Sequence, residues 1–146
     1  MAVMNRQDAE PAEAAKVLVE PAARLNGLAE AVIGAAIEVH RLLGPGFPES
    51  VYEEALAWEL ETREIPFARQ VPFAVDYKGR RVGQGRIDLL IDNELIVELK
   101  SVEQIALVHR GQLLSYLRAT RKHLGLLINF NVALLKRGVQ RLVASP

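Results

Sequence analysis

The segment Asp88-Leu-Leu-Ile-Asp-Asn-Glu-Leu-Ile-Val-Glu-Leu-Lys100 decides the fold of this chain. Two apolar runs flank the turn-forming pair Asp92-Asn93, a pattern that predicts two hairpin strands near the middle of a sheet. Because side chains alternate along a strand, Glu98 and Lys100 point to the same face. Burying an unpaired charge costs on the order of several kcal/mol, so these two side chains either neutralise each other or bind a third group. A metal ion is the most direct candidate for that third group.

A further carboxylate, that of Asp88, opens the same segment. If the loop between the strands held only two residues, Asp88 would lie opposite Val97 and would face away from Glu98. The two carboxylates converge only if the loop holds an odd number of residues, most simply 92–94, or if a bulge shifts the register. We predict that shift. Hard cations such as Mg²⁺ use one or two protein carboxylates and keep several waters, which fits this pair.

Length and composition limit the remaining possibilities. With 146 residues, half of them hydrophobic, we expect one domain over residues 24–146, preceded by an Ala- and Glu-rich appendage over residues 1–23 with a short helix at about 10–19. No apolar run approaches the roughly 18 residues of a membrane span, and the N-terminus lacks a signal pattern, so we expect a cytoplasmic protein. The absence of cysteine excludes disulfides and thiolate metal sites.

The charges are unevenly distributed although the net charge is zero. Residues 1–75 contain 6 Lys and Arg against 12 Asp and Glu, and residues 76–146 contain 12 against 6. Such asymmetry can mark a surface that faces nucleic acid, but solvated faces of an ordinary domain explain it equally well. The same two interpretations apply to the basic cluster of Arg118, Arg121 and Lys122, which either is solvated or positions phosphates.

The periodicity predicts the element order helix, helix, three strands, helix and one or two strands. This order indicates an α/β fold with a central mixed sheet of four to five strands flanked by helices. Pro72 indicates that part of the first strand lies at an edge or is kinked, and Gly83 and Gly85 indicate a bulge or a close backbone approach in the second. Tyr52 and Trp58 are predicted to lie in the core. The expected helices are 28–43, 48–63 and 102–119, and the expected strands are 67–77, 81–91, 95–100, 124–130 and 139–143.

Asp88 followed by Glu98-Leu-Lys100 resembles the signature of the PD-(D/E)XK nucleases, with Ile87 in place of the usual proline. The resemblance implies a restriction-endonuclease-like core in which both acids bind Mg²⁺, or Mn²⁺ as an alternative, while Lys100 activates water. It also implies a nucleic acid partner, with DNA as the expected substrate. A domain this small would need a homodimer or a second binding event to cut both strands of a duplex.

Two further motifs resemble groups within that superfamily. The segment Gly46-Phe-Pro-Glu49-Ser-Val-Tyr52 resembles the motif of the GxxExxY family, which implies that Glu49 joins the metal site, although the helix dipole alone also favours an acid there. The segment Gln112-Leu-Leu-Ser-Tyr116 resembles the Gln-x3-Tyr motif of RecB-like nucleases, in which these side chains contact the substrate backbone or brace the lysine.

The identity of the third metal ligand and the activity itself remain open at this level. Glu38 near the end of the first helix is an alternative to Glu49, and His109 shares a helix face with Gln112 and Tyr116. The expected function is a metal-dependent nuclease that hydrolyses phosphodiester bonds. One alternative is a catalytically inactive module that keeps the fold and binds nucleic acid or a protein partner. Another is a structural protein that retains the charge cluster.

Overall fold

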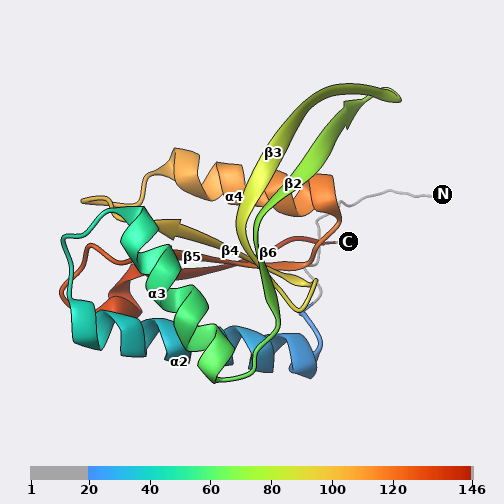
Figure 1. Ribbon diagram of the computed structural model, residues 1–146. Helices are drawn as coiled ribbons and strands as arrows, with labels where there is room; N and C mark the ends of the chain where they lie inside the picture. The colour runs from blue at the N-terminus through green and yellow to red at the C-terminus, as the bar shows by residue number, and fades with distance from the viewer. Residues whose placement is uncertain (1–19, 146) are drawn as a thin grey trace.

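The computed structural model describes residues 20–145, and the helix predicted at 10–19 lies outside this range. Within the described part, three α-helices and a short 3₁₀ helix surround five strands (Figure 1). The elements are α2 (Ala23–Leu43), α3 (Glu49–Thr62), β2 (Phe67–Tyr77), β3 (Arg80–Ile91), β4 (Leu95–Lys100), α4 (Leu107–Thr120), β5 (Leu124–Asn129), the 3₁₀ helix η1 (Leu135–Gly138) and β6 (Val139–Val143).

The strands form one mixed sheet in the order β2-β3-β4-β5-β6. Only β4 and β5 run parallel, because α4 connects them as a crossover, whereas the other neighbours are antiparallel. Helices α2 and α3 cover one face and α4 covers the other (Figure 1). The predicted α/β fold with a mixed sheet is therefore confirmed, and so is the edge position of the strand that contains Pro72.

Alternation along β4 separates the two halves of the core. Leu95, Val97 and Leu99 pack against α2 and α3, whereas Ile96 packs with the side chains of α4. The hydrophobic burial of such side chains stabilises the sheet by about 1.5–3 kcal/mol each. Because Glu98 and Lys100 follow Ile96 at two-residue steps, they lie on the α4 side. The apolar pattern of this strand thus sets the face on which its charges lie.

Two predictions about helices were wrong. The third predicted helix begins at Leu107 instead of residue 102, because residues 101–106 form a loop held by a side chain of β5, described below. Trp58, predicted to be core, is 70% exposed on α3, whereas Tyr52 is fully buried as predicted. The side of α3 that packs on the sheet is formed instead by Tyr52, Leu56 and Leu60.

Strand β3 is much longer than its contact with β4. It pairs with β4 only through residues 89–91, whereas it pairs with β2 along its whole length. Residues 71–77 and 80–87 therefore form a two-stranded extension, here called the β2–β3 ribbon, which projects past α4 (Figure 1). Ile87 packs on the α4 side and Leu89 on the α2 side, although they are two residues apart. The strand consequently twists strongly at Asp88, between them.

A close approach at Gly85 attaches the base of the ribbon to α4, as the glycines predicted. Phe73 pairs with Gly85 across the ribbon, and its ring packs edge-on against Tyr116 with the ring centroids 4.8 Å apart. A Cβ atom added at Gly85 would lie closer than 3.0 Å to three atoms of the Phe73 ring. The glycine therefore leaves the space in which the aromatic ring reaches α4.

We expect Gly85→Ala to destabilise the protein by about 1–3 kcal/mol, because the Phe73 ring must move away from α4 to admit the new methyl group. Chemical denaturation followed by circular dichroism would measure the loss. Gly83→Ala is the matched control, since nothing lies within 4 Å of a Cβ atom at that position. Equal stabilities of the two variants would show that the ring contact does not constrain the ribbon.

Candidate active site at the divergence of two strands

The turn between β3 and β4 sets the register that the metal-site prediction requires. Asp92 and Asn93 adopt φ values of 50° and 59°, which short polar side chains tolerate, and the Glu94 N–H donates to the Ile91 carbonyl at 3.0 Å. Glu94 is the extra residue, so Ile91 pairs with Leu95. The predicted register shift is confirmed, and Asp88 and Glu98 consequently face the same side of the sheet.

Asp88 and Glu98 lie where β3 separates from β4, and each carboxylate binds the backbone of the opposite strand. The Asp88 N–H donates to Glu98 Oε2 at 2.9 Å, and the Leu99 N–H donates to Asp88 Oδ2 at 2.9 Å. These reciprocal bonds replace the backbone pairing that ends at Leu89 and Val97. They fix both side chains while leaving Asp88 Oδ1 and Glu98 Oε1 without a hydrogen bond from the described residues.

The two acids are poorly solvated and repel each other. Glu98 is only 5% exposed, and burial, together with the charge of Asp88, raises its pKa to about 8. Burial also raises the pKa of Asp88, although the hydrogen bond from Leu99 opposes this rise. Lys100 acts electrostatically on both acids but forms no ion pair with either within the described residues. The carboxylate pair therefore lacks a direct counter-charge.

The donor set fits a hard divalent cation. Two fixed carboxylates, each with one oxygen available, match the one or two protein carboxylates by which Mg²⁺ is usually held, and a cation would offset their repulsion. Within residues 20–145, no group of three or more acidic, histidine or cysteine side chains is arranged to hold a metal ion. Asp88 and Glu98 each keep one carboxylate oxygen that could contribute to cation binding.

The loop before α3 directs Glu49 toward this pair. The Tyr52 hydroxyl donates to the Gly44 carbonyl at 2.6 Å and accepts the Phe47 N–H at 3.1 Å. Gly46 adopts a φ of 110°, in the region that favours glycine. Tyr52 and Gly46 thus shape the loop, and Glu49 is the first residue of α3. Two of the three residues of the GxxExxY pattern therefore have a structural role.

Glu49 itself lies at the end of β4. Its Oε2 accepts the Ser101 N–H at 3.4 Å, and the Ser101 hydroxyl donates to the Phe47 carbonyl at 2.6 Å. After burial, the Glu49 charge is among the smaller influences that raise the pKa of Asp88 and of Glu98. Glu49 therefore adds negative charge to the site from a third element of the fold.

The alternative acid, Glu38, lies elsewhere. Both of its carboxylate oxygens accept hydrogen bonds from Arg41, at 3.0 and 2.9 Å, and these bonds lower the pKa of Glu38. The charges that act on it are those of Arg41 and Arg63, and neither Asp88 nor Glu98 is among them. The structure therefore brings Glu49, but not Glu38, toward the carboxylate pair.

A residue that the sequence analysis missed, Glu53, is also close to Asp88. After burial, its charge is the largest of those that raise the pKa of Asp88. Arg69 and Gln70 of β2 hold the Glu53 carboxylate at 3.0 and 2.9 Å. Gln70 has a φ of 52°, a strained value for a strand residue, and lies between Arg69 and Val71, which pair with Leu89 and Ile87, at the position opposite Asp88. The spacing of four residues from Glu49 on one helix would have indicated it.

Helix α4 forms the other wall of the site. Burial raises the pKa of the Tyr116 hydroxyl, and the nearby charges of Glu98 and Asp88 add to that rise. Gln112 lies one turn earlier on α4 and is exposed. His109 accepts the Ala106 N–H through Nδ1 at 2.9 Å and thereby closes the first turn of α4. Tyr116 is thus beside the acids, whereas His109 serves the helix start.

The loop after Lys100 is held by Asn129, to which the sequence analysis assigned no role. Asn129 pairs with Lys100 across the parallel strands and is 2% exposed. Its side-chain amide donates to the Val102 carbonyl at 2.9 Å, and its Oδ1 accepts the Val102 N–H at 3.0 Å and the Asn131 N–H at 3.2 Å. Because these contacts satisfy a buried amide, Asn129 fixes the chain where it leaves the site.

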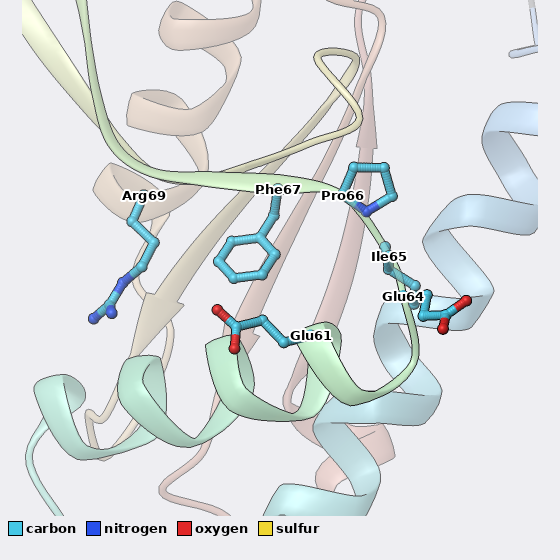
Figure 2. A pocket seen from close by; sticks show the side chains of 6 residues that line it. All are labelled: Glu61, Glu64, Ile65, Pro66, Phe67 and Arg69. Carbon is cyan, nitrogen blue, oxygen red and sulfur yellow. The ribbon is translucent and has the colours of Figure 1, made fainter.

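A hollow of about 560 Å³ lies away from the carboxylates, between the C-terminal half of α3 and the start of β2, where Glu61, Phe67 and Arg69 are among its lining residues (Figure 2). Figure 2 shows the Arg69 side chain extending from β2 toward α3, where it contacts Glu53 and Glu54. We favour the strand divergence as the active site, because charge and available oxygen atoms converge there.

Comparison with known proteins agrees with this geometry. Residues 26–142 match the model of the PD-(D/E)XK nuclease superfamily, whereas no curated protein gives a significant match. None of the helices within residues 20–145 combines the length and the hydrophobicity of a membrane-spanning segment. The matched region extends from α2 to β6 and includes both carboxylates, Lys100 and α4. This chain belongs to the PD-(D/E)XK nuclease superfamily.

Proposed function

We propose that this protein is a metal-dependent nuclease that hydrolyses phosphodiester bonds in DNA. The observation that carries the proposal is the facing pair Asp88 and Glu98, each fixed by a backbone N–H and each with a second oxygen available. Lys100 lies on the same face of the sheet. These residue types suit metal-dependent phosphodiester hydrolysis, because acids can hold a cation and a positive charge can act near the reacting phosphate.

Each residue receives a role from its position. Asp88 and Glu98 would hold Mg²⁺ or Mn²⁺, which when bound supplies positive charge to the scissile phosphate. Lys100 would orient the attacking water and offset charge that develops on phosphorus. Tyr116 and Gln112 would contact the substrate backbone from α4. Glu49 and Glu53 would orient water around the cation instead of binding it directly.

We also propose that the protein belongs to the GxxExxY family. The roles of Gly46 and Tyr52 in shaping the loop, together with the position of Glu49 at the end of β4, support membership in the GxxExxY family. Because one such site cuts one strand at a time, a double-strand cut would require a homodimer or two binding events.

We expect Mg²⁺- or Mn²⁺-dependent cleavage of at least one substrate in a panel of single-stranded, duplex, nicked and branched DNA together with RNA. The same panel without divalent ions, and with Asp88→Asn, should show no product above background. Retention of cleavage by Asp88→Asn would refute the proposed site. Nucleic acid binding without cleavage by the wild-type protein under all these conditions would instead support the non-catalytic module that the sequence left open.

A further inference from the structure

The cations of this protein fall into two groups. In the described part of the chain, five arginines pair with acidic side chains, namely Arg24, Arg41, Arg63, Arg69 and Arg141. By contrast, Arg80, Arg81 and Arg86 of the β2–β3 ribbon form no ion pair with a described residue, and neither do Arg118 and Arg121 at the end of α4. Five arginines without an acidic partner thus lie on the ribbon and at the end of α4. Arg110, which donates to Gln140, and Lys136 and Arg137 on η1 also lack an acidic partner among the described residues.

The tip of the ribbon is exposed and basic. Tyr77 and Val82 are both 61% exposed, and Lys78 Nζ lies 5.3 Å from the centroid of the Tyr77 ring. Val75 pairs with Gly83 and Asp76 with Arg81, so Val82 is an extra residue that bulges from β3. An exposed ribbon end of this kind would also risk pairing with other sheets, so its charges serve at least to protect it.

The basic surface continues from the ribbon onto α4. A hollow of about 470 Å³ separates the two elements and is lined by Asp76 on β2 and by Ser115, Arg118 and Arg121 on the helix side. Lys122 does not belong to this surface, because its Nζ donates to the Asn93 carbonyl at 2.8 Å. The ribbon leads directly to the candidate site, because β3 runs from Arg80 through Asp88.

We propose that the β2–β3 ribbon lies in the major groove of duplex DNA, with Lys78, Arg80 and Arg81 on the phosphates and the strand divergence at the scissile bond. The position of the cut in this inference rests on the proposed function, whereas the DNA-binding surface is inferred from the residues of the ribbon alone. A two-stranded ribbon fits the major groove of B-form DNA, whereas that of A-form RNA is too deep and narrow.

A single strand is a poorer fit for the same surface. Binding of unpaired nucleic acid relies on exposed aromatic faces on which bases stack. At the ribbon tip, Lys78 covers a face of the one exposed aromatic ring, that of Tyr77. Several charges beside a single aromatic ring, one face of which already holds Lys78, favour contacts with a phosphate backbone of fixed geometry, as in a duplex, over the stacking of successive bases.

The length of the ribbon gives the contacts a defined position. Asp88 lies six residue steps after Val82, which at about 3.3 Å per step corresponds to roughly 20 Å along the strand. At about 3.4 Å per base pair, this distance corresponds to about six base pairs. The ribbon would therefore contact the duplex on one side of the cut, about six base pairs from it.

The first test measures binding without cleavage. In the Asp88→Asn background, Arg80→Ala/Arg81→Ala should weaken binding to a 30-base-pair duplex by about tenfold and lower the salt slope by about 2. Lys136→Ala/Arg137→Ala removes the same charge from exposed positions on η1, which packs against α2, and should change affinity less than twofold. Fluorescence anisotropy would measure both variants on duplex DNA, single-stranded DNA and duplex RNA of one sequence.

The second test locates the ribbon on the substrate. The chain contains no cysteine, so Val82→Cys provides a unique attachment point for a DNA-cleaving iron chelate. Chemical scission should occur about six base pairs from the enzyme's own cut and on one side of it. Because Val82 is an exposed bulge residue, the substitution should leave the ribbon folded.

The outcomes separate this inference from the proposed function. If the protein binds duplex DNA through the ribbon but cleaves nothing, the proposed binding surface stands and the proposed nuclease activity is refuted. If the ribbon variants cleave DNA as well as the wild type does, the proposed binding surface is refuted and the nuclease activity stands. The ribbon inference is also overturned if losses on single-stranded DNA or duplex RNA equal those on duplex DNA, if the η1 control loses as much affinity, or if no nucleic acid binds.

Discussion

Replacing Lys100 by methionine should reduce the rate of DNA cleavage by about 10²–10⁴-fold while leaving the fold and cation binding in place. Lys100 is half-buried at the end of β4, and its charge acts on both Asp88 and Glu98 without forming an ion pair with either in the described residues. A charge held near the acids but not bound to them is available to the substrate. Methionine keeps most of the apolar stem and removes the ammonium group.

The measurement is single-turnover cleavage of the best substrate from the panel, combined with thermal denaturation and calorimetric titration of Mg²⁺. Lys122→Met is the matched control, because Lys122 Nζ donates to the Asn93 carbonyl in the β3–β4 turn. The charge of Lys122 is not among those that act on Asp88 or Glu98. We expect that control to cleave at the wild-type rate. If Lys100→Met cleaved within about threefold of wild type, Lys100 would be a structural charge and another group would activate the water.

The candidate acids were predictable from sequence because their geometry is determined locally. Residues 88–100 form a hairpin whose turn residues, Asp92 and Asn93, tolerate positive φ and thereby set the register. Strand alternation alone places Glu98 and Lys100 on one face, whatever the register. The side on which Asp88 lies depends on the loop length, because a two-residue loop would have turned it away from Glu98. The longer loop was therefore predicted from the requirement that the carboxylates converge, and the structure has it.

Long-range contacts determine what the sequence analysis missed. The start of α4 depends on Asn129, which is 27 residues from Val102 in sequence and fixes the intervening loop. The exposure of Trp58 and the position of Glu53 depend on how α3 rotates against the sheet. Local periodicity predicts that a helix has a buried side, but a short helix with weak apolar asymmetry leaves that side ambiguous.

The projection of the ribbon was unpredictable for a related reason. The patterns of β2 and β3 predict two paired strands, and their bounds agree closely with the structure. The sequence does not indicate that β3 leaves β4 after three residue pairs, because that separation depends on the strong twist at Asp88. The same separation leaves the N–H groups of Asp88 and Leu99 to the two carboxylates, so one irregularity of the backbone creates both the candidate site and the free ribbon.

The stability of the metal-free protein should fall as the pH rises from about 4.5 to about 8. The pKa of Glu98 is raised from 4.5 to about 8 by burial and by Asp88. Between these values the unfolded chain has lost a proton that the folded protein still binds, so rising pH favours unfolding. The loss attributable to this group is on the order of a few kcal/mol, and Asp88, whose pKa is also raised, acts in the same direction.

Urea denaturation at a series of pH values in EDTA would measure this effect, and Glu98→Gln is the control because it removes the titrating group but keeps an oxygen for the Asp88 N–H. The difference between the two proteins isolates Glu98 from other titrating side chains. Mg²⁺ at about 100 times its dissociation constant should restore about 2.7 kcal/mol to the wild type at pH 8, and little to the variant. If the stabilities of the wild type and of Glu98→Gln changed in parallel across this range, the pKa of Glu98 would not be raised in the folded protein. Its buried charge would then not destabilise the metal-free protein, and a cation would not be needed to offset that charge.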